Sequence, residues 1–456
     1  MARQQQSRLA CAAVAAALLL GEQAAAFAPA NLHSRQLFAS QRNGAVTKRQ
    51  VLAEPVVVDK TASSRPVLDL DALRNVQLSG LNGQALVDKE FPTKNEVLSA
   101  IPAECFELDT KRSLQCTAWS LVLTAACAAA GAALIPVTPA ALPAWVAYAA
   151  VTGTVAMGNW VIAHECGHGA FSSNRALQDF VGFTLHSALL VPYYSWQRSH
   201  AVHHAHTNHV THGETHVPET AHRAGEGGLG SLAIRNRVEG LLGKPVGRAL
   251  YGAVQLINHL LIGWPAYLLV GATGGPSRGV TNHFVPTSDS LFPGAWKKKV
   301  WTSTAGVAVT AAALAAWAAH SGVATVAALY GGPYLVVNAW LVVYTWLQHT
   351  NSDVPHFASD NFSFIKGAMH SIDRPYGRVI DFLHHRIGST HVAHHIESKI
   401  PHYRAKEATE ALRAAFPEHY LYDPTPVPVA LWRVAKYCTA VEKRGDKYVF
   451  VQEPSA

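Results

Sequence analysis

The chain contains three clusters of histidine whose spacing could allow them to bind metal ions. Residues three and four positions apart share one face of a helix, so each cluster can direct two or three imidazole rings at one point. Imidazole binds iron, copper and zinc alike, and composition alone does not choose among them. The clusters read "HECGH", "HAVHH" and "HVAHH", and their histidines are His164 and His168; His200, His203 and His204; and His391, His394 and His395.

Eight histidines are too many for one zinc ion, which takes four ligands and in structural sites usually includes cysteine. The six cysteines form no CxxC pair, which indicates free thiols rather than a disulfide framework. Two metal ions fit the count better, each with four or more nitrogen ligands and with open positions. Such a pair can clamp and activate a small molecule such as dioxygen. One HxxxH or HxxHH pattern can be incidental, but three on one side of a membrane predict a metal site.

Other histidines are assigned by their surroundings. His349, in "WLQHT", follows the last predicted spanning helix on the side of the clusters and is predicted as a ninth ligand; His356, in "VPHF", is a second candidate. The histidines of "HAHTNHVTHGETH" are predicted to lie in a solvated polar loop, and four more at the surface or the membrane interface. These two sets are His206, His209, His212 and His216, and His259, His320, His384 and His385.

Charged residues near the clusters offer secondary roles. A carboxylate can orient a ligating imidazole through its second ring nitrogen, or it can be a solvated surface group. The carboxylates concerned are Glu165, Asp179, Glu214 and Asp381, and Arg198 is a candidate contact for a lipid phosphate or a donor protein.

The elements that must position the clusters are revealed by missing charges. Ser113–Ala163 and Val300–Ser352 contain no Asp, Glu, Lys or Arg. A membrane-spanning helix needs about 20 apolar residues, so each block holds two helices and a tight turn. Lys111 and Arg112 precede the first block and "KKK" at 297–299 precedes the second, which places all four open ends on one side. The predicted spans are 116–136, 142–163, 300–319 and 326–347.

The composition supports a membrane protein. Apolar residues make up 49% of the 456 and charged residues only 15%, against about 25% charged in a soluble domain. The net charge is +7, but the basic residues form no long tract, which argues against a nucleic-acid-binding protein. The apolar stretches 177–196 and 249–275 are predicted to lie in the membrane interface. The second carries polar residues, and a single extra crossing there would put the histidine clusters before and after it on opposite sides of the membrane. The predicted fold class is an all-α integral membrane protein with four transmembrane helices in two hairpins, interfacial helices and a histidine-rich cap on one face.

The first 60 residues resemble a targeting sequence. Residues 1–26 carry two arginines, an apolar run and then small residues, as a signal peptide does. Residues 27–60 are basic and transit-like. A signal followed by a transit segment that opens with Phe27 resembles the bipartite plastid presequence of algae with secondary plastids. That resemblance implies a plastid membrane, and the endoplasmic reticulum is the alternative. Residues 61–456 are predicted to form the membrane domain.

The boxes "HECGHGAFS", "SWQRSHAVHH" and "THVAHH" resemble those of membrane fatty acid desaturases, in the same order along the chain. The likeness extends beyond the boxes and covers roughly residues 85–450. It is closest to the plant Δ12 (omega-6, oleate) desaturases, with the omega-3 desaturases next. The segments that carry it are "LHSALLVPYYSW", "LLIGWPAYL", "YTWLQHT", "IDRPYGRVID" and "IPHYRAKEAT".

The resemblance implies a di-iron centre held by the histidines and O2 as co-substrate. The reaction it implies is removal of two hydrogens from an acyl chain of a membrane lipid to give a cis double bond, with Δ12 desaturation of oleoyl to linoleoyl first. The implied electron donor is ferredoxin in a plastid or cytochrome b5 at the endoplasmic reticulum. The His-Pro-Gly-Gly signature of a fused cytochrome b5 domain does not occur in the sequence.

Alternatives remain open at this point. "HECGHGAFS" is nearly the first box of omega-3 desaturases, whereas the C-terminal run "YDPTPVPVALWRVAKYCTAVEKRGDKYVF" favours the Δ12 type. Acyl hydroxylases and acetylenases share the scaffold. A histidine-rich metal transporter would place its ligands inside the spans, near the midplane of the membrane. The clusters here lie just outside the predicted spans, which argues against transport.

Overall fold

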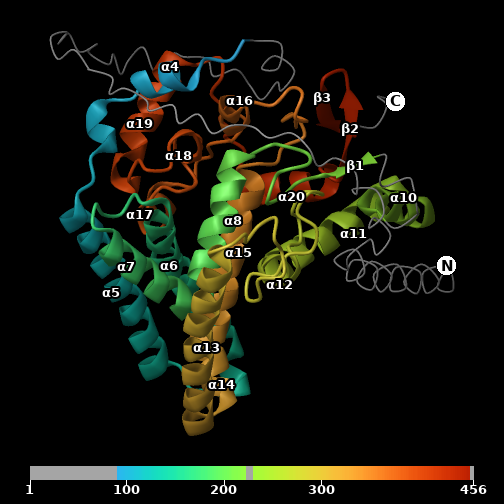
Figure 1. Ribbon diagram of the computed structural model, residues 1–456. Helices are drawn as coiled ribbons and strands as arrows, with labels where there is room; N and C mark the ends of the chain where they lie inside the picture. Colours follow the sequence, from blue (N-terminus) through green and yellow to red (C-terminus); the bar gives the residue numbers. More distant parts are fainter. Residues whose placement is uncertain (1–89, 222–229, 452–456) are drawn as a thin grey trace. The chain divides into compact units, whose positions relative to one another are not determined.

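The computed structural model describes residues 90–221 and 230–451 (Figure 1). Most of the described elements are helices, which confirms the predicted all-α membrane architecture. The predicted signal segment at residues 1–26, the transit-like segment at 27–60 and the start of the predicted membrane domain lie outside the described residues.

The first predicted hairpin is formed by α5 (Thr110–Leu134) and α6 (Leu142–His168). The side chain of Asp109 caps α5 by accepting the backbone N–H of Arg112 at 3.0 Å. The helix α6 ends at Gly169, whose φ of +77° lies in the left-handed region that favours glycine. It therefore extends past the predicted end at residue 163, and the first histidine cluster occupies its last turn.

The second hairpin consists of α13 (Trp296–Ser321) and a long bent segment made of α14 (Val323–Val326), the π-helical η4 (Ala327–Gly331) and α15 (Gly332–Leu347). The π turn precedes Pro333, which has no N–H to donate. The carbonyl of Leu329, four residues earlier, accepts a hydrogen bond from the hydroxyl of Tyr148 at 3.0 Å. The bend is thus satisfied by a side chain of the first hairpin.

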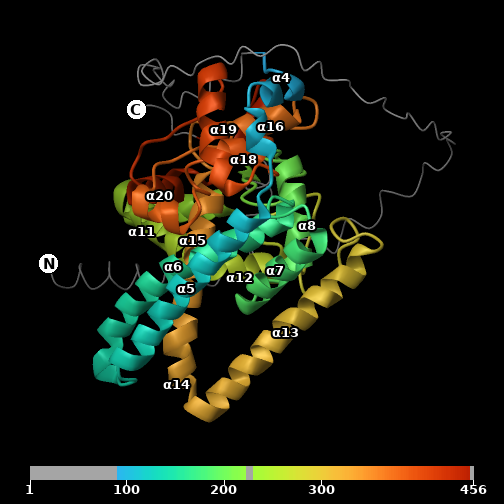
Figure 2. The ribbon, with the colours of Figure 1, turned by 90° about the vertical axis from the view of Figure 1, so that its left-hand side faces the viewer.

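The two hairpins point the same way. Figures 1 and 2 show the turns of both hairpins at one end, and α18 (His391–Ile396) and α19 (His402–Ala415) at the other. This arrangement matches the common orientation that the flanking basic residues predicted.

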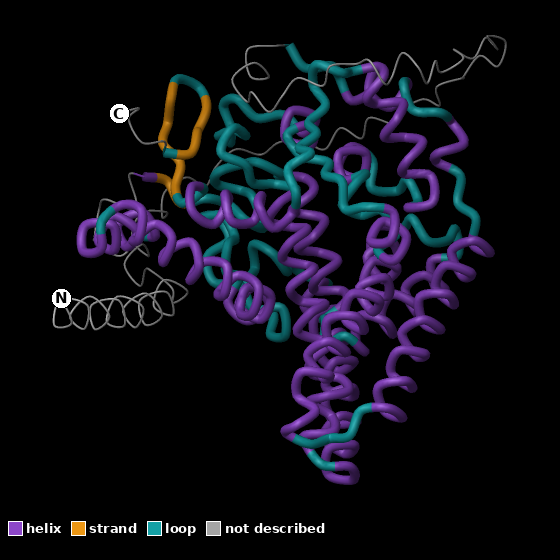
Figure 3. The backbone as a smooth tube through the Cα atoms, turned by 180° about the vertical axis from the view of Figure 1, so that it is seen from behind, coloured by secondary structure: helices purple, strands orange, loops and turns teal. Residues whose placement is uncertain are grey.

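A fifth helical segment is also long and apolar enough to cross a membrane, so the described residues hold five candidates where the sequence predicted four. It consists of α11 (Lys244–Ile257), the π-helical η3 (Asn258–Gly263) and α12 (Trp264–Val270). Figures 1 and 3 show α11 running across the direction of α15 rather than beside it. A helix lying along the membrane surface has this orientation relative to spanning helices.

Shorter elements complete the described chain. A small sheet, which the all-α prediction missed, pairs β1 with β2 in parallel and β2 with β3 as an antiparallel hairpin around Gly445. The strands are β1 (Glu219–Thr220), β2 (Ala440–Arg444) and β3 (Lys447–Phe450). The remaining helices are α4 (Lys94–Ser99), η1 (Ala103–Phe106), η2 (Pro139–Ala141), α7 (Arg175–Ala188), α8 (Tyr193–Ala205), α10 (Ser231–Leu242), α16 (Phe364–Met369), α17 (Arg378–Leu383) and α20 (Val427–Tyr437).

The segment "IDRP" ties the end of α15 to the helices above it. Arg374 is fully buried, donates from Nε to the carbonyl of Leu347 at 3.0 Å, and pairs with Asp423. Its neighbour Asp373 accepts the backbone N–H of Val392 in α18 at 2.9 Å. A buried charge is costly unless it is paired, so these contacts fix where α15 and α18 meet.

Candidate metal centre

All nine predicted histidines lie together at the end of the hairpins that carries α18. They come from four places in the chain: the last turn of α6, the helix α8, the residue His349 just after α15, and the helix α18. Seven of the nine are buried, and His168 and His200 are half-buried.

The rings form two adjacent groups. In the first group, which we call group 1, one ligand-type nitrogen of each histidine lies within 4.8 Å of the others. The Nε2 atom of His164 lies 3.0 Å from that of His200 and 3.2 Å from that of His168. The members of group 1 are His164, His168, His200, His204 and His394.

Group 2 is built in the same way. His203, His349 and His395 bring their donor nitrogens within 4.8 Å of one another. The Nε2 of His391 lies 3.0 Å from that of His349 and 3.0 Å from that of His395, so we count it as the fourth member. The rings of His204 and His395 stack with centroids 4.1 Å apart, which places the two groups side by side.

Each HxxHH cluster is shared between the groups, and this corrects the expectation that each cluster points at one place. Successive helical residues turn by about 100°, so positions i and i+4 are nearly aligned and position i+3 is displaced to one side. His200 and His204 join group 1, while His203 between them joins group 2. In α18 the roles reverse, because His391 and His395 join group 2 and His394 joins group 1.

The hydrogen-bond partner of His391 fixes which of its ring nitrogens is free to bind a metal. The Nδ1 of His391 lies 3.2 Å from the carbonyl oxygen of Ile387, and a carbonyl can only accept, so Nδ1 carries the proton. Burial lowers the pKa of His391 to about 3, so the ring is neutral and its Nε2 has a bare lone pair. Two nitrogens bound at about 2.1 Å to one metal ion, at angles of about 90–109°, lie about 3.0–3.4 Å apart. The measured separations of 3.0–3.2 Å fall in this range.

Burial keeps the other rings in the form that binds metal. It lowers the pKa of His203 to about 4 and also lowers the pKa of His349 and His395. The Nε2 of His394 is buried with no hydrogen-bond partner. Because an unpaired buried polar atom is costly, this orphaned nitrogen fits a metal ligand. The donor set as a whole fits two cations with nitrogen ligands.

Polar groups outside the rings fix their orientation. The Nδ1 of His203 lies 2.8 Å from Oγ1 of Thr215, and the Nδ1 of His395 lies 3.0 Å from Oγ1 of Thr207. Glu165 places Oε1 3.3 Å from Nδ1 of His164. Such partners of the second ring nitrogen set the tautomer of a ligating histidine.

Of the four carboxylates predicted near the clusters, Glu165 therefore contacts an imidazole of the site. The other three bind other groups: Glu214 is buried against Arg278 and Tyr267, Asp179 accepts from Tyr193, and Asp381 pairs with Arg386. Arg198 donates to the carbonyl of Leu291 and lies over the ring of Trp296. The expectation that Glu214 could be a solvated surface group is wrong, because its side chain is 1% exposed.

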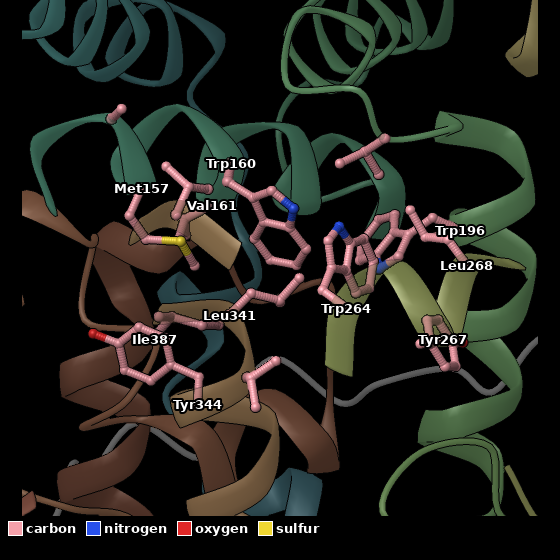
Figure 4. Packing of buried hydrophobic residues seen from close by; sticks show 14 residues of the cluster. Met157, Trp160, Val161, Trp196, Trp264, Tyr267, Leu268, Leu341, Tyr344 and Ile387 are labelled. Atoms are coloured by element: carbon pink, nitrogen blue, oxygen red, sulfur yellow. The ribbon is translucent and has the colours of Figure 1, made fainter. Parts of the chain in front are cut away.

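Tryptophan rings form one wall of the site. Trp196 stacks on His200 with centroids 4.5 Å apart, and Trp160 stacks on His164 at 5.6 Å. Figure 4 shows Trp160 and Trp264 within the same buried cluster, above Leu341. Rings packed this tightly exclude water from group 1 and hold its imidazoles in place.

A small cavity borders group 2. His203 and His349 line it together with Thr215, His216 and Asn208. The side chains around this cavity are mostly polar, whereas the tryptophan wall beside group 1 is apolar.

The remaining histidines depart from several expectations. His320 is exposed and His259 is half-buried, as predicted for surface or interface residues, but His384 and His385 are buried. Both nitrogens of His384 are bonded, to the hydroxyl of Tyr344 at 2.7 Å and the carbonyl of Thr154 at 2.6 Å. Two adjacent histidines give no periodicity, so the sequence did not reveal their burial.

The loop after α8 is also less solvated than predicted. His209 is buried beside Ser359, and His206, His212 and His216 are half-buried. His356 is buried but belongs to neither group; its backbone N–H bonds the carbonyl of Tyr448.

Three residues with a part in the site escaped the sequence analysis. Thr207 and Thr215 lie among the loop histidines, where an ordinary polar residue gives no signal. Asp373 lies 18 positions before His391 in the chain and holds α18 through the backbone of Val392. Its only signal was its place in "IDRP", a segment of the quoted resemblance.

Comparison with known proteins agrees with this geometry. Residues 139–425 match the family of fatty acid desaturases. The chain is 37% identical over 360 residues to an omega-6 fatty acid desaturase of the endoplasmic reticulum from Brassica juncea, covering 78% of this chain and 89% of the relative. It is 38% identical over 358 residues to a Δ12 fatty acid desaturase from Arabidopsis thaliana (77% and 88%) and 38% identical over 366 residues to one from Mortierella isabellina (79% and 90%). The chain belongs to the fatty acid desaturase family, an integral membrane family of oxidoreductases.

Proposed function

We propose that the protein is an O2-dependent acyl-lipid desaturase that converts oleoyl to linoleoyl chains by Δ12 desaturation. The observation that carries the proposal is the pair of adjacent histidine groups, with neighbouring Nε2 atoms 3.0–3.2 Å apart, at one end of two apolar hairpins. The Δ12 assignment rests on the names of the relatives, all three of which are Δ12 or omega-6 desaturases.

Two iron ions are proposed as the cofactors, one in each group. Bound iron would supply the O2 chemistry that removes two hydrogens from an unactivated methylene pair. The proposed ligands are the eight box histidines and His349, five in group 1 and four in group 2. Thr207 and Thr215 bond the Nδ1 atoms of His395 and His203, and Glu165 lies beside the Nδ1 of His164. A proton on Nδ1 of each of these rings would leave its Nε2 free for metal.

The remaining residues serve to position the acyl chain and to exclude water. The apolar hairpins present the lipid, and the wall formed by Trp160 and Trp196 keeps water from group 1. The polar cavity at group 2 is the side from which water and protons reach the site. The proposed electron donor is ferredoxin or cytochrome b5.

The proposed location is a plastid membrane. It rests on the signal segment at residues 1–26 and the transit-like segment at 27–60, of which Phe27 is the first residue. The relative from Brassica juncea is named for the endoplasmic reticulum, which is the competing location. A fluorescent protein fused after residue 60 distinguishes them: plastid fluorescence supports the proposal, and a reticular pattern overturns it.

The activity is tested in yeast, which makes oleate but no linoleate. The chain without its presequence is expressed with and without ferredoxin and ferredoxin reductase, and fatty acid methyl esters are analysed by gas chromatography. A new diene in the wild type and in the His320→Ala protein, but not in the His203→Ala protein, is expected. His320 is the matched control because it is exposed on α13, away from both groups. Retained activity in His203→Ala, or no diene with either donor, contradicts the proposal.

A further inference from the structure

A third set of metal-ligating side chains lies outside the nine histidines. Cys116 is on α5, His385 follows α17, and His402 is the first residue of α19. One donor atom of each lies within 4.8 Å of the other two. Three separate elements therefore bring a thiol and two imidazoles to one place.

The backbone and a neighbouring serine direct His385 toward this place. His385 has a φ of +51°, in the left-handed region that a non-glycine residue adopts at a cost. Its Nε2 lies 2.9 Å from Oγ of Ser120, which is one helical turn beyond Cys116 on the same face of α5. The adjacent His384 points the other way, to Tyr344 and Thr154.

The ring of His402 has an unmet hydrogen bond. Its centroid lies 4.5 Å from that of His385, and its Nε2 is buried with no partner. Leaving such a nitrogen unpaired is costly, and a bound cation would remove that cost. Burial lowers the pKa of His385 to about 4 and lowers that of His402 as well, so both rings are neutral and able to bind metal.

We propose that Cys116, His385 and His402 form a separate binding site for a zinc ion. Zinc prefers this mixture of thiolate and imidazole, in tetrahedral geometry. Ligand atoms of such a site lie about 3.3–3.8 Å apart, so small side-chain rotations close the present set around the ion. Binding replaces the S–H bond of Cys116 by an S–Zn bond, and the proton passes to solvent.

A small cavity borders the two imidazoles of the proposed site. His385 and His402 line it together with Glu165, Thr390 and His394, so a water molecule can complete the tetrahedron. Three protein ligands with one open position would clamp α5, the segment after α17 and α19 together.

The clamp is linked to group 1. The backbone N–H of His402 donates to Oε2 of Glu165 at 2.9 Å, and the other oxygen of Glu165 contacts His164. Zinc at the third site would therefore hold the start of α19 in place, and through Glu165 it would help to orient His164 of group 1. The role of the site is positional, and it does not depend on which reaction the nine histidines carry out.

Cobalt substitution tests the site directly. Co2+ is added to the purified, iron-loaded full chain, and the thiolate-to-cobalt charge-transfer absorption is recorded; a site made of histidine alone cannot give this band. Zinc bound per chain is measured in parallel after equilibration with Zn2+ and removal of the excess. The variants are Cys116→Ala, His385→Ala and the matched control Cys127→Ala, which removes another half-buried thiol from the same helix.

The wild type and Cys127→Ala are expected to show the thiolate band and about one more equivalent of zinc than Cys116→Ala, which loses the band. His385→Ala is expected to weaken zinc binding by at least about tenfold. Absence of the thiolate band in the wild type overturns the site without recourse to any variant. An equal band and equal zinc content in wild type and Cys116→Ala overturn it as well.

Discussion

The Nε2 atoms of His203 and His349 lie 3.1 Å apart, although 146 positions separate the two residues in the chain. His203 belongs to an HxxHH cluster, whereas His349 belongs to no cluster. Group 1 draws two (i, i+4) pairs from α6 and α8 and one histidine from α18. Group 2 has only one such pair, in α18. Without His349 it would hold three histidines, so His349 supplies its fourth.

His349→Ala should therefore empty group 2 and leave group 1 in place. We expect iron to fall from about two ions to about one per chain, with activity lost, because a metal site deprived of one of four ligands binds far more weakly. The measurement is iron content of the purified protein by plasma mass spectrometry. His356→Ala is the control, since His356 is buried nearby but belongs to neither group. Equal iron in His349→Ala and wild type would remove His349 from the site.

Glu165→Gln should weaken group 1 while preserving the fold. Burial raises the pKa of Glu165 to about 8, so its carboxyl group ionises beside His164 only where a cation bound in group 1 favours the negative charge. An amide oxygen can still accept the N–H of His402, but glutamine cannot ionise. Loss of an outer partner of a ligating histidine typically costs 10–100-fold in metal affinity or activity. Competition with an iron chelator gives the affinity. An unchanged chelator midpoint would show that Glu165 has no such role.

Asp373→Ala should destabilise the protein by about 1–3 kcal/mol, because it leaves buried donors on Val392 and Tyr420 without an acceptor. Asp373→Asn keeps an acceptor for the N–H of Val392 and should cost less than Asp373→Ala. Thermal unfolding of the two variants in detergent makes the comparison. A smaller cost for the alanine variant than for the asparagine variant would contradict the positioning role.

The metal-free protein should lose stability as the pH falls below about 6.5. Burial lowers the pKa of His203 to about 4 and that of His391 to about 3, whereas these groups have a pKa of about 6.5 when unfolded. Between these values the unfolded chain binds more protons, so the free energy of unfolding decreases with decreasing pH by about 1.4 kcal/mol per pH unit for each group. Melting temperatures of the chelator-treated protein at pH 7.5 and pH 5.5 test this.

The His203→Gln variant serves as the comparison for that pH series. It removes one of the titrating rings and should flatten the dependence of the melting temperature on pH. Two results would contradict the prediction. One is a melting temperature of the wild type that does not depend on pH, and the other is the same pH dependence in wild type and variant.

The sequence was informative where residues recur with a helical period or where a long stretch contains no charged residue. Two charge-free blocks gave both hairpins within a few residues, and the spacing of the clusters gave eight histidines that do come together. The prediction that His349 lies beside the clusters used the end of a spanning helix, which defines the side on which the residue emerges, and its ring does lie next to His203 and His391. The family followed from boxes and flanking segments that local physics alone would not connect.

The sequence was uninformative where tertiary packing decides. The division of each HxxHH cluster between two groups depends on how α8 and α18 face each other, which no local pattern contains. The π turns at Asn258–Gly263 and Ala327–Gly331 depend on packing around α15. The burial of His384, His385 and Glu214 depends on partners far away in the chain.

The position of the new double bond is the measurement that tests the central claim most directly. Fatty acids from yeast expressing the chain are derivatised at their double bonds, and the fragments are identified by mass spectrometry. The account predicts linoleate, with double bonds at Δ9 and Δ12, made from the oleate of the cell. A new bond at the omega-3 position that forms only when linoleate is supplied, or a hydroxyl group in place of a double bond, would contradict the Δ12 assignment.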